Sequence, residues 1–261
     1  MSKNVANKLI KSAPFIPNEV SKIVLNLVIL LSTTIITVAC TSNLKQQDLD
    51  EDEGTLIIYS ERDMDKNTFK VDLFVNAKYL RIADNRAQED YILFDRKAAT
   101  IFNVNEADKT IMVIKSAAVT IKPPIDIKYE VTAQPSAAIP KVQGITATHY
   151  RYNANDKHCY DVVSTEKTFM PDVVQALREY RQVLAGEHAK SVGNIPKDML
   201  DACDLAINVF YPVKHLENGL PMRESDRRGY LKFLINYKMK YKLPPEKFNL
   251  PDGYKKYSIG E

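Results

Sequence analysis

The clearest structural signal in the chain is LKFLINYKMKYKL, residues 231–243. Apolar or aromatic side chains occupy every second position of it, and lysines and one asparagine fill most of the others, with Leu234 as the exception. A period of two is typical of a β-strand with one buried face. Such a strand extends about 40 Å, and this length indicates a strongly curved sheet. We expect the concave side to carry an apolar face made of Phe233, Ile235, Tyr237, Met239 and Tyr241.

An ordinary sheet with the same residues on a filled core is the alternative, and only the curved form leaves a cavity. Shorter strand-like segments precede this stretch. One alternates Phe69, Val71, Leu73 and Val75 with mostly polar residues. The other expected strands cover residues 79–82, 91–94, 100–102, 110–114, 128–132, 146–152 and 158–163. Polar turns separate them at a spacing of about ten residues, which is typical of successive antiparallel neighbours.

Two helices are expected between the last two strand regions. Pro171 suits the first turn of one helix and Gly186 its end, while Pro196 and Pro212 bracket the second. Both segments repeat apolar residues at helical spacing. The sequence therefore predicts an α+β fold. It consists of a strongly curved antiparallel sheet, a half-barrel, with two or more covering helices, in a single domain over residues 54–261.

The N-terminal segment has the order of a secretory signal. Four lysines precede an apolar run at residues 23–39, which ends in small or β-branched residues before Cys40. This arrangement resembles the lipobox of bacterial lipoproteins, in which the signal is cut before a cysteine that then carries the lipid. The resemblance implies a signal peptide at residues 1–39 and lipidation at Cys40. An uncleaved transmembrane anchor is the alternative, although the run is short for a membrane span.

Residues 40–53 are expected to form the lipidated cysteine and a tether. The tether ends in an acidic run, which repels itself and stays solvated. In enteric-type bacteria, an aspartate directly after the lipidated cysteine resembles a signal for retention in the inner membrane. This chain has Thr41 at that position, which favours the outer membrane. We therefore expect a lipid-anchored protein in the bacterial cell envelope, at the outer membrane and facing the periplasm.

Charge argues against nucleic acid as a partner. The whole chain has 36 basic and 33 acidic residues. Removing residues 1–39 takes away four lysines and one glutamate, which leaves 32 of each sign. A neutral domain lacks the basic surface that binds phosphates by releasing counterions.

The cysteines agree with an envelope protein. If Cys40 carries the lipid, Cys159 and Cys203 remain as an even pair in an oxidising compartment. We expect a disulfide that joins a strand-like segment to the apolar face of the second helix. Two buried free thiols, or a metal pair with His158, are the alternatives, but a zinc site normally has four close ligands.

Catalytic motifs are absent from the sequence. It contains no Gly-x-Ser-x-Gly, no His-Glu-x-x-His and no phosphate-binding glycine loop. His149 and His158 flank an expected hairpin. The sequence places no candidate nucleophile where it would pair with them, so we interpret both as exposed or structurally bonded histidines. We expect a protein that is not an enzyme, with no cofactor and no metal.

Four segments carry a wider resemblance: Tyr79–Asp84, Tyr91–Lys97, Ile101–Asn105 and the ending Pro245–Tyr254. They are similar to successive strands and the close of the lipoprotein-carrier-like (LolA/LolB-like) half-barrel superfamily, and especially to envelope lipoproteins within it. The resemblance covers residues 56–254. It implies helices over the mouth of the half-barrel and binding of acyl chains or other apolar ligands. This chain has no residue that matches the functional arginine of a carrier.

Two functions of different class follow. The first is a membrane-anchored binding module for an apolar ligand or lipid in the concavity. The second is a structural or interaction lipoprotein with a filled core and a protein partner in the envelope. A real cavity lined by apolar side chains favours the first, and interdigitated side chains favour the second.

Overall fold

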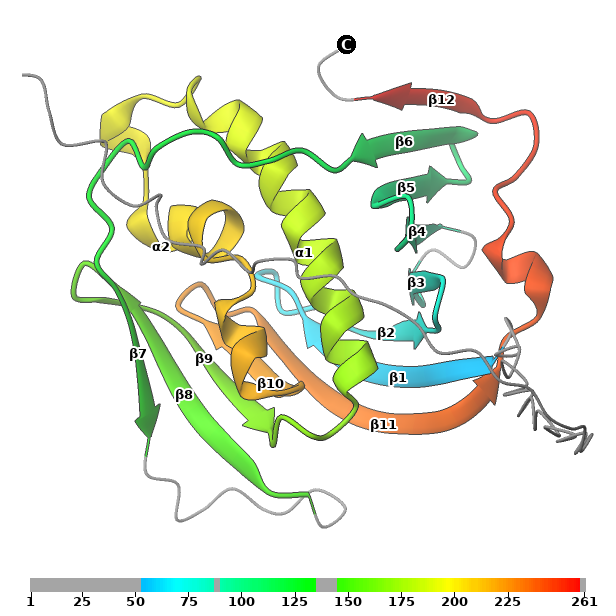
Figure 1. The fold of residues 1–261 in the computed structure, drawn as a ribbon, viewed down its shortest axis with the longest axis horizontal. Coiled ribbons are helices and arrows are strands. Elements are labelled where there is room, and N and C mark those ends of the chain that lie inside the picture. The colour runs from blue at the N-terminus through cyan, green and yellow to red at the C-terminus, as the bar shows by residue number, and fades with distance from the viewer. Residues whose placement is uncertain (1–52, 87–89, 135–144, 259–261) are drawn as a thin grey trace, which may run out of the picture. The chain divides into compact units, whose positions relative to one another are not determined.

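The computed structural model describes residues 53–258, except 87–89 and 135–144. Within them, twelve strands form one sheet in the order β12-β6-β5-β4-β3-β2-β1-β11-β10-β9-β8-β7 (Figure 1). The strands are β1 (Glu53–Arg62), β2 (Thr68–Val75), β3 (Tyr79–Asp84), β4 (Tyr91–Asp95), β5 (Thr100–Asn105), β6 (Thr110–Lys115), β7 (Tyr129–Gln134), β8 (Ala147–Ala154), β9 (Lys157–Thr165), β10 (Pro221–Asp226), β11 (Leu231–Lys242) and β12 (Lys255–Ser258).

All neighbouring strands run antiparallel except β12, which lies parallel to β6. The sheet curves and stays open, because its two edge strands, β7 and β12, do not pair with each other. The predicted α+β half-barrel is therefore confirmed. Every strand expected between residues 69 and 163 is present, whereas β10 and β12 were not expected from the sequence.

The long helix α1 (Pro171–Val192) covers the concave face of the sheet (Figure 1). Its N-terminal buried residues, such as Val173 and Val183, belong to the main hydrophobic core together with Leu80 and Ile101 from the strands, whereas Ala189 and Val192 pack in a separate cluster with Leu205. The rings of Phe94 and Tyr180 meet edge to face with centroids 6.0 Å apart. This packing excludes water from the centre of the domain and supplies its main apolar stabilisation.

The expected end of α1 at Gly186 is wrong, because the helix continues to Val192. Gly186 is buried where the backbone after β6 crosses the helix. A Cβ atom at this position would lie 2.1 Å from the carbonyl oxygen of Ala117. The glycine therefore permits a close approach between backbones and does not terminate the helix.

The second helix is shorter and less regular than the sequence predicts. A 3₁₀ turn at Lys197–Met199 ends at the extended Leu200. Asp201 then caps α2 (Ala202–Leu205) by accepting a hydrogen bond from the backbone N–H of Asp204 at 3.1 Å. The segment continues as the π-helical residues Ala206–Phe210. Further 3₁₀ turns lie at Lys214–Asn218 and Pro245–Phe248.

The predicted apolar face of the last strand is split by the structure. Phe233, Ile235 and Met239 have exposed fractions of 41%, 42% and 63%, whereas Tyr237 packs against the core. The physical reason is two register shifts against β1, which break the strict alternation of sides. Leu234, which the pattern marked as the exception, faces the core opposite Tyr59.

The outer face of the sheet is covered unevenly. The chain after β11 passes over β2 and β3, where Phe248 stacks on Tyr79 with centroids 5.3 Å apart and packs against Phe74 at 5.4 Å. Tyr241, the last member of the predicted apolar face, meets Phe74 in the same outer cluster. The covered part of the outer face is thus a second, small apolar layer.

Candidate functional site

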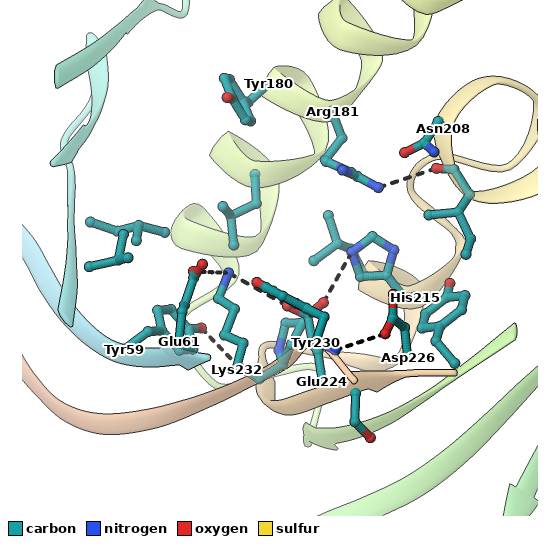
Figure 2. Close-up of a pocket in the computed structure, with 18 of the residues that line it drawn as sticks. Tyr59, Glu61, Tyr180, Arg181, Asn208, His215, Glu224, Asp226, Tyr230 and Lys232 are labelled. Carbon is teal, nitrogen blue, oxygen red and sulfur yellow. Dashed lines mark hydrogen bonds and ion pairs between the residues drawn. The ribbon is translucent and has the colours of Figure 1, made fainter. Parts of the chain in front are cut away.

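A cavity of about 340 Å³ lies beside α1, on the concave side of the sheet. Its walls come from α1, the π-helical segment after α2, and strands β1, β2, β3, β9, β10 and β11 (Figure 2). The cavity falls within the size range of ligand sites, about 300–1,000 Å³. The structure therefore contains an unfilled space where the sequence suggested a concavity.

One end of this cavity is charged. Lys232 on β11 lies between two carboxylates, with its Nζ 3.7 Å from Oε1 of Glu61 and 3.5 Å from Oε2 of Glu224 (Figure 2). Its ammonium also sits over the ring of Tyr59, 4.4 Å from the centroid. The side chains of these three charged residues are only 15–19% exposed. The alternation in the sequence had assigned Lys232 to a solvated face, and the structure places it in the cavity instead.

His215 faces the same charged end from the 3₁₀ turn Lys214–Asn218. Its Nε2 lies 3.7 Å from Oε1 of Glu224. Burial lowers the pKa of His215 to about 4, in spite of the nearby carboxylate, so the imidazole is neutral near pH 7. Burial by itself raises the pKa of Glu224, but Lys232, His215 and Arg181 together outweigh it and the pKa is lowered. Glu224 therefore stays ionised.

Hydroxyl and guanidinium groups complete the polar wall. The hydroxyl of Tyr59 donates a hydrogen bond of 2.9 Å to the carbonyl oxygen of Pro221. Burial raises the pKa of Tyr230, which keeps its hydroxyl protonated beside Glu61. Arg181 of α1 donates to the carbonyl oxygens of Ile207 and Pro212, which ties the helix to the π-helical segment.

The other end of the cavity is apolar and shares wall residues with a second cavity. Val71, Leu73, Ile82 and Leu177 line this apolar end. A neighbouring cavity of about 380 Å³ shares the side chains of Glu61, Val71, Ile82 and Tyr180, and continues toward β4. We call the two together the groove. The second cavity is mixed in character, because Asp84, Arg86, Asp90 and Asn103 line it beside Phe69 and Ile92.

The predicted disulfide is confirmed. Cys159 on β9 and Cys203 on α2 are bonded, with 2.03 Å between the sulfur atoms and 5.4 Å between the Cα atoms. The bond attaches α2 to the sheet, and Arg227 adds an ion pair of 2.7 Å to Asp201 just before the helix. The π-helical wall of the groove follows directly after this fastened segment.

The two histidines that flank the β8–β9 hairpin are bonded to a single carboxylate. Nε2 of His149 lies 2.9 Å from Oδ1 of Asp161, and Nε2 of His158 lies 2.8 Å from its Oδ2. Arg151 also donates to Asp161, at 3.1 Å. This matches the interpretation of these residues as structurally bonded. In the described ranges, no group of three or more His, Cys, Asp or Glu side chains could hold a metal ion.

The remaining predicted site residues lie elsewhere. Cys40 and the segments 1–39 and 40–52 fall outside the described residues. Of the predicted apolar face, none of the five residues lines either cavity of the groove. Among residues 53–258 apart from the two gaps, no helix is long and apolar enough to cross a membrane. Sequence reasoning missed Glu61, Glu224 and His215, because they are brought together only by strand pairing and by the turn after the π-helical segment.

Comparisons with known proteins give fold-level similarities only. No protein-family model and no curated protein matches the chain. An uncharacterized conserved protein from Thermus thermophilus is 7% identical with a TM-score of 0.43, covering 79% of this chain and 91% of that one. PNGF-II is 9% identical with a TM-score of 0.39, and the match covers 79% of this chain and 31% of PNGF-II. MucB is 7% identical with a TM-score of 0.37, and the match covers 79% of this chain and 60% of MucB. At these scores, the matches show neither a family nor a function.

Proposed function

We propose that this protein is a lipid-anchored, non-enzymatic binding module that holds an apolar or amphiphilic ligand, such as a lipid, in the groove. The observation that carries the proposal is the space beside α1 on the concave side of the sheet, where Val71, Ile82 and Leu177 line the first cavity, and Val71 and Ile82 also line the second. Interiors without a ligand role are normally packed with few voids larger than a water molecule.

The position of the groove supports the proposal. It lies beside a well-packed core, so the walls are held by rigid strands and by α1. Binding an apolar chain there would remove it from water at about 25 cal/mol for each Å² buried. A site with this construction fits the lipoprotein-carrier-like half-barrel superfamily, to which we propose the chain belongs.

The anchor and location are further parts of the proposal. Cys40 would carry the lipid after cleavage of residues 1–39, and the domain would face the periplasm from the outer membrane. Labelled palmitate should be incorporated into the full chain and not into the Cys40→Ser variant. Equal labelling of both proteins would contradict the anchor, while ligand binding by the domain would remain a separate question.

The binding function can be tested on a chain that starts at Thr41 and is purified gently from the periplasm. The described fold lies inside the compact unit Lys45–Glu261, so such a chain keeps all of it. We expect native mass spectrometry to show a co-purifying lipid that is lost under mild denaturation, with its class given by extraction. Leu177→Trp should fill the groove and reduce the bound fraction.

Phe233→Trp is the matched control, because Phe233 is exposed on the outer face and does not line the groove. The chain has no other tryptophan, so the fluorescence of each variant reports its own site. Added ligand should change the emission of a tryptophan at position 177 and leave that at 233 unchanged. A bare mass, with no lipid bound by either protein, would favour the second candidate, an interaction lipoprotein whose envelope partner contacts the exposed Phe233, Ile235 and Met239.

A further inference from the structure

The inner end of the groove carries balanced charges. Two carboxylates and two cationic side chains line it: Glu61, Glu224, Arg181 and Lys232. Lys232 pairs with both glutamates, at 3.7 and 3.5 Å, and Arg181 of α1 acts electrostatically on Glu224 as well (Figure 2). The imidazole of His215 at the same end is neutral near pH 7. The inner end therefore has no net charge.

The other charged side chains of the first cavity pair among themselves. Arg228 of the β10–β11 turn lies 3.3 Å from a carboxylate oxygen of Asp226 and 3.4 Å from one of Asp204 on α2. Two carboxylates against one guanidinium leave one negative charge in this set. Because Asp204 and Arg228 are 43% and 53% exposed, water compensates that charge. It does not alter the balance at the inner end.

A charged head group would upset this balance. The side chains of Glu61, Glu224 and Lys232 are only 15–19% exposed, so little water reaches the inner end. A charge that leaves water without a compensating partner is costly, whereas a hydroxyl that makes hydrogen bonds is not. A cation and an anion would each enter a site whose own charges already cancel. The charge balance therefore favours an uncharged polar group.

Uncharged polar side chains of the groove are a second, independent observation. The amide of Asn208 and the hydroxyl of Tyr180 line the first cavity, and neither makes a hydrogen bond with any residue of the described ranges (Figure 2). Burial raises the pKa of Tyr180, which keeps its hydroxyl protonated. Each of the two groups offers both a donor and an acceptor. A hydroxyl of a ligand, which also donates and accepts, matches them.

We propose that the ligand of the groove is an amphiphile with an uncharged, hydroxyl-bearing head group at the inner end and its apolar chain along Val71, Ile82 and Leu177. This inference rests on the proposed function, because it names the chemical class of the ligand that the groove takes. Hydroxyls can donate to the two glutamates and accept from Lys232, whose contacts with them exceed the usual hydrogen-bond distance.

The test compares three amphiphiles that share a lauroyl chain and differ in the charge of a small head group. The chain that starts at Thr41 is titrated with monolauroylglycerol, which is neutral, with lauroylcholine, which is cationic, and with N-lauroylglycine, which is anionic. Isothermal titration calorimetry is used below their critical micelle concentrations. We expect the neutral amphiphile to bind about tenfold more tightly than either charged one, because only it leaves the charges of the inner end balanced.

Two substitutions should shift this preference in opposite directions. Glu61→Gln leaves an excess positive charge and should strengthen binding of the anionic amphiphile about tenfold, whereas Lys232→Gln should do the same for the cationic one. Glu130→Gln and Lys128→Gln change an exposed ion pair outside the groove and are the matched controls, which should keep the order of the unaltered protein. If a charge variant fails to fold, Asn208→Leu takes its place and should weaken binding of monolauroylglycerol about fivefold.

Equal affinities for the three amphiphiles in the unaltered protein, or tighter binding of a charged one, would overturn the assignment of the head group. So would charge variants that keep the original order, or an Asn208 variant that binds monolauroylglycerol as before. These results would leave the binding function intact. Failure of all three amphiphiles to bind would count against the proposed function itself, so the two failures are distinguishable in one series of titrations.

Discussion

Two neighbouring regions of the concave face belong to the same sheet and have opposite character. Under α1, Leu80, Phe94 and Ile101 are essentially fully buried and pack against the helix. Beside α1, the same sheet carries Glu61, Lys232 and Glu224 around an unfilled space. A long regular helix presents a continuous apolar stripe to the sheet. The short 3₁₀ and π-helical pieces on the other side offer no such stripe, so the gap stays open.

The largest loss of stability is expected in the packed region under α1. Phe94→Ala should lower the free energy of unfolding by about 3–5 kcal/mol, because it leaves a cavity under α1. Urea unfolding would measure it. Ile82→Ala, at the wall of the groove, should cost clearly less, since its side chain already faces empty space. Equal losses at the two positions would mean that the regions do not differ in packing.

The disulfide should contribute the next largest effect. Replacing Cys159 and Cys203 together by serine should cost about 2–4 kcal/mol, because the bond closes a long loop. Unfolding with and without reductant provides the check, and the reduced protein should behave like the double variant. Native-state hydrogen exchange should show the loosening first in α2 and the π-helical wall of the groove. An equal loss of hydrogen-exchange protection in α1 and in the strands beneath it would contradict the idea that the disulfide stabilises mainly the wall of the groove.

A pH dependence should come from the groove. The pKa of His215 is about 4 in the folded protein and ordinarily 6.5, so the unfolded chain binds its proton first as the pH falls. Stability from this residue is fully present above pH 6.5 and is lost as the pH falls toward 4, by about 3 kcal/mol in all. Thermal unfolding across pH 4–7 would show the slope.

His215→Gln is the control for this dependence, because glutamine does not titrate. The variant should have a flatter profile between pH 4 and 6.5. The lowered pKa of Glu224 acts in the same direction, but its stability is lost only below pH 4.5. An unchanged profile in the glutamine variant would show that His215 is not buried in neutral form.

The smallest effect is expected on the outer face of β11. Met239→Ser should change stability by no more than about 0.5 kcal/mol, since the side chain is mostly exposed. Leu234→Ala, five residues earlier on the same strand, should cost about 2–4 kcal/mol. Denaturant midpoints of the two variants measure the contrast. A large loss of stability in Met239→Ser would mean that Met239 is buried, as the alternating sequence pattern predicted.

Much of the fold could be predicted from the sequence. The alternation of Phe69, Val71 and Leu73 gave the correct buried side of β2, because this strand pairs without shifts on both edges. The cysteine pair was also identified correctly, since an even count in an oxidising compartment favours a bond. These inferences depend on local pattern and on composition alone.

The groove could not be found in this way. Glu61 and Lys232 are opposed only because β1 pairs with β11, two strands from opposite ends of the domain's sequence. Register shifts in that pair also turn Leu234 inward and leave Phe233 outside. No pattern within a single segment contains this information. Lys232 carried no local signal either, because it belongs to the same polar series of the strand as Lys238, Lys240 and Lys242.

Local sequence features are enough to predict the α+β class, the positions of most strands, the start of α1 and the disulfide. These follow from periodicity, turn residues and cysteine count, which act over a few residues. The bulges of β11, the continuation of α1 past Gly186 and the charged end of the groove arise only in the folded domain. Each of these depends on contacts between segments distant in the chain, whose geometry is fixed only when the whole sheet has formed.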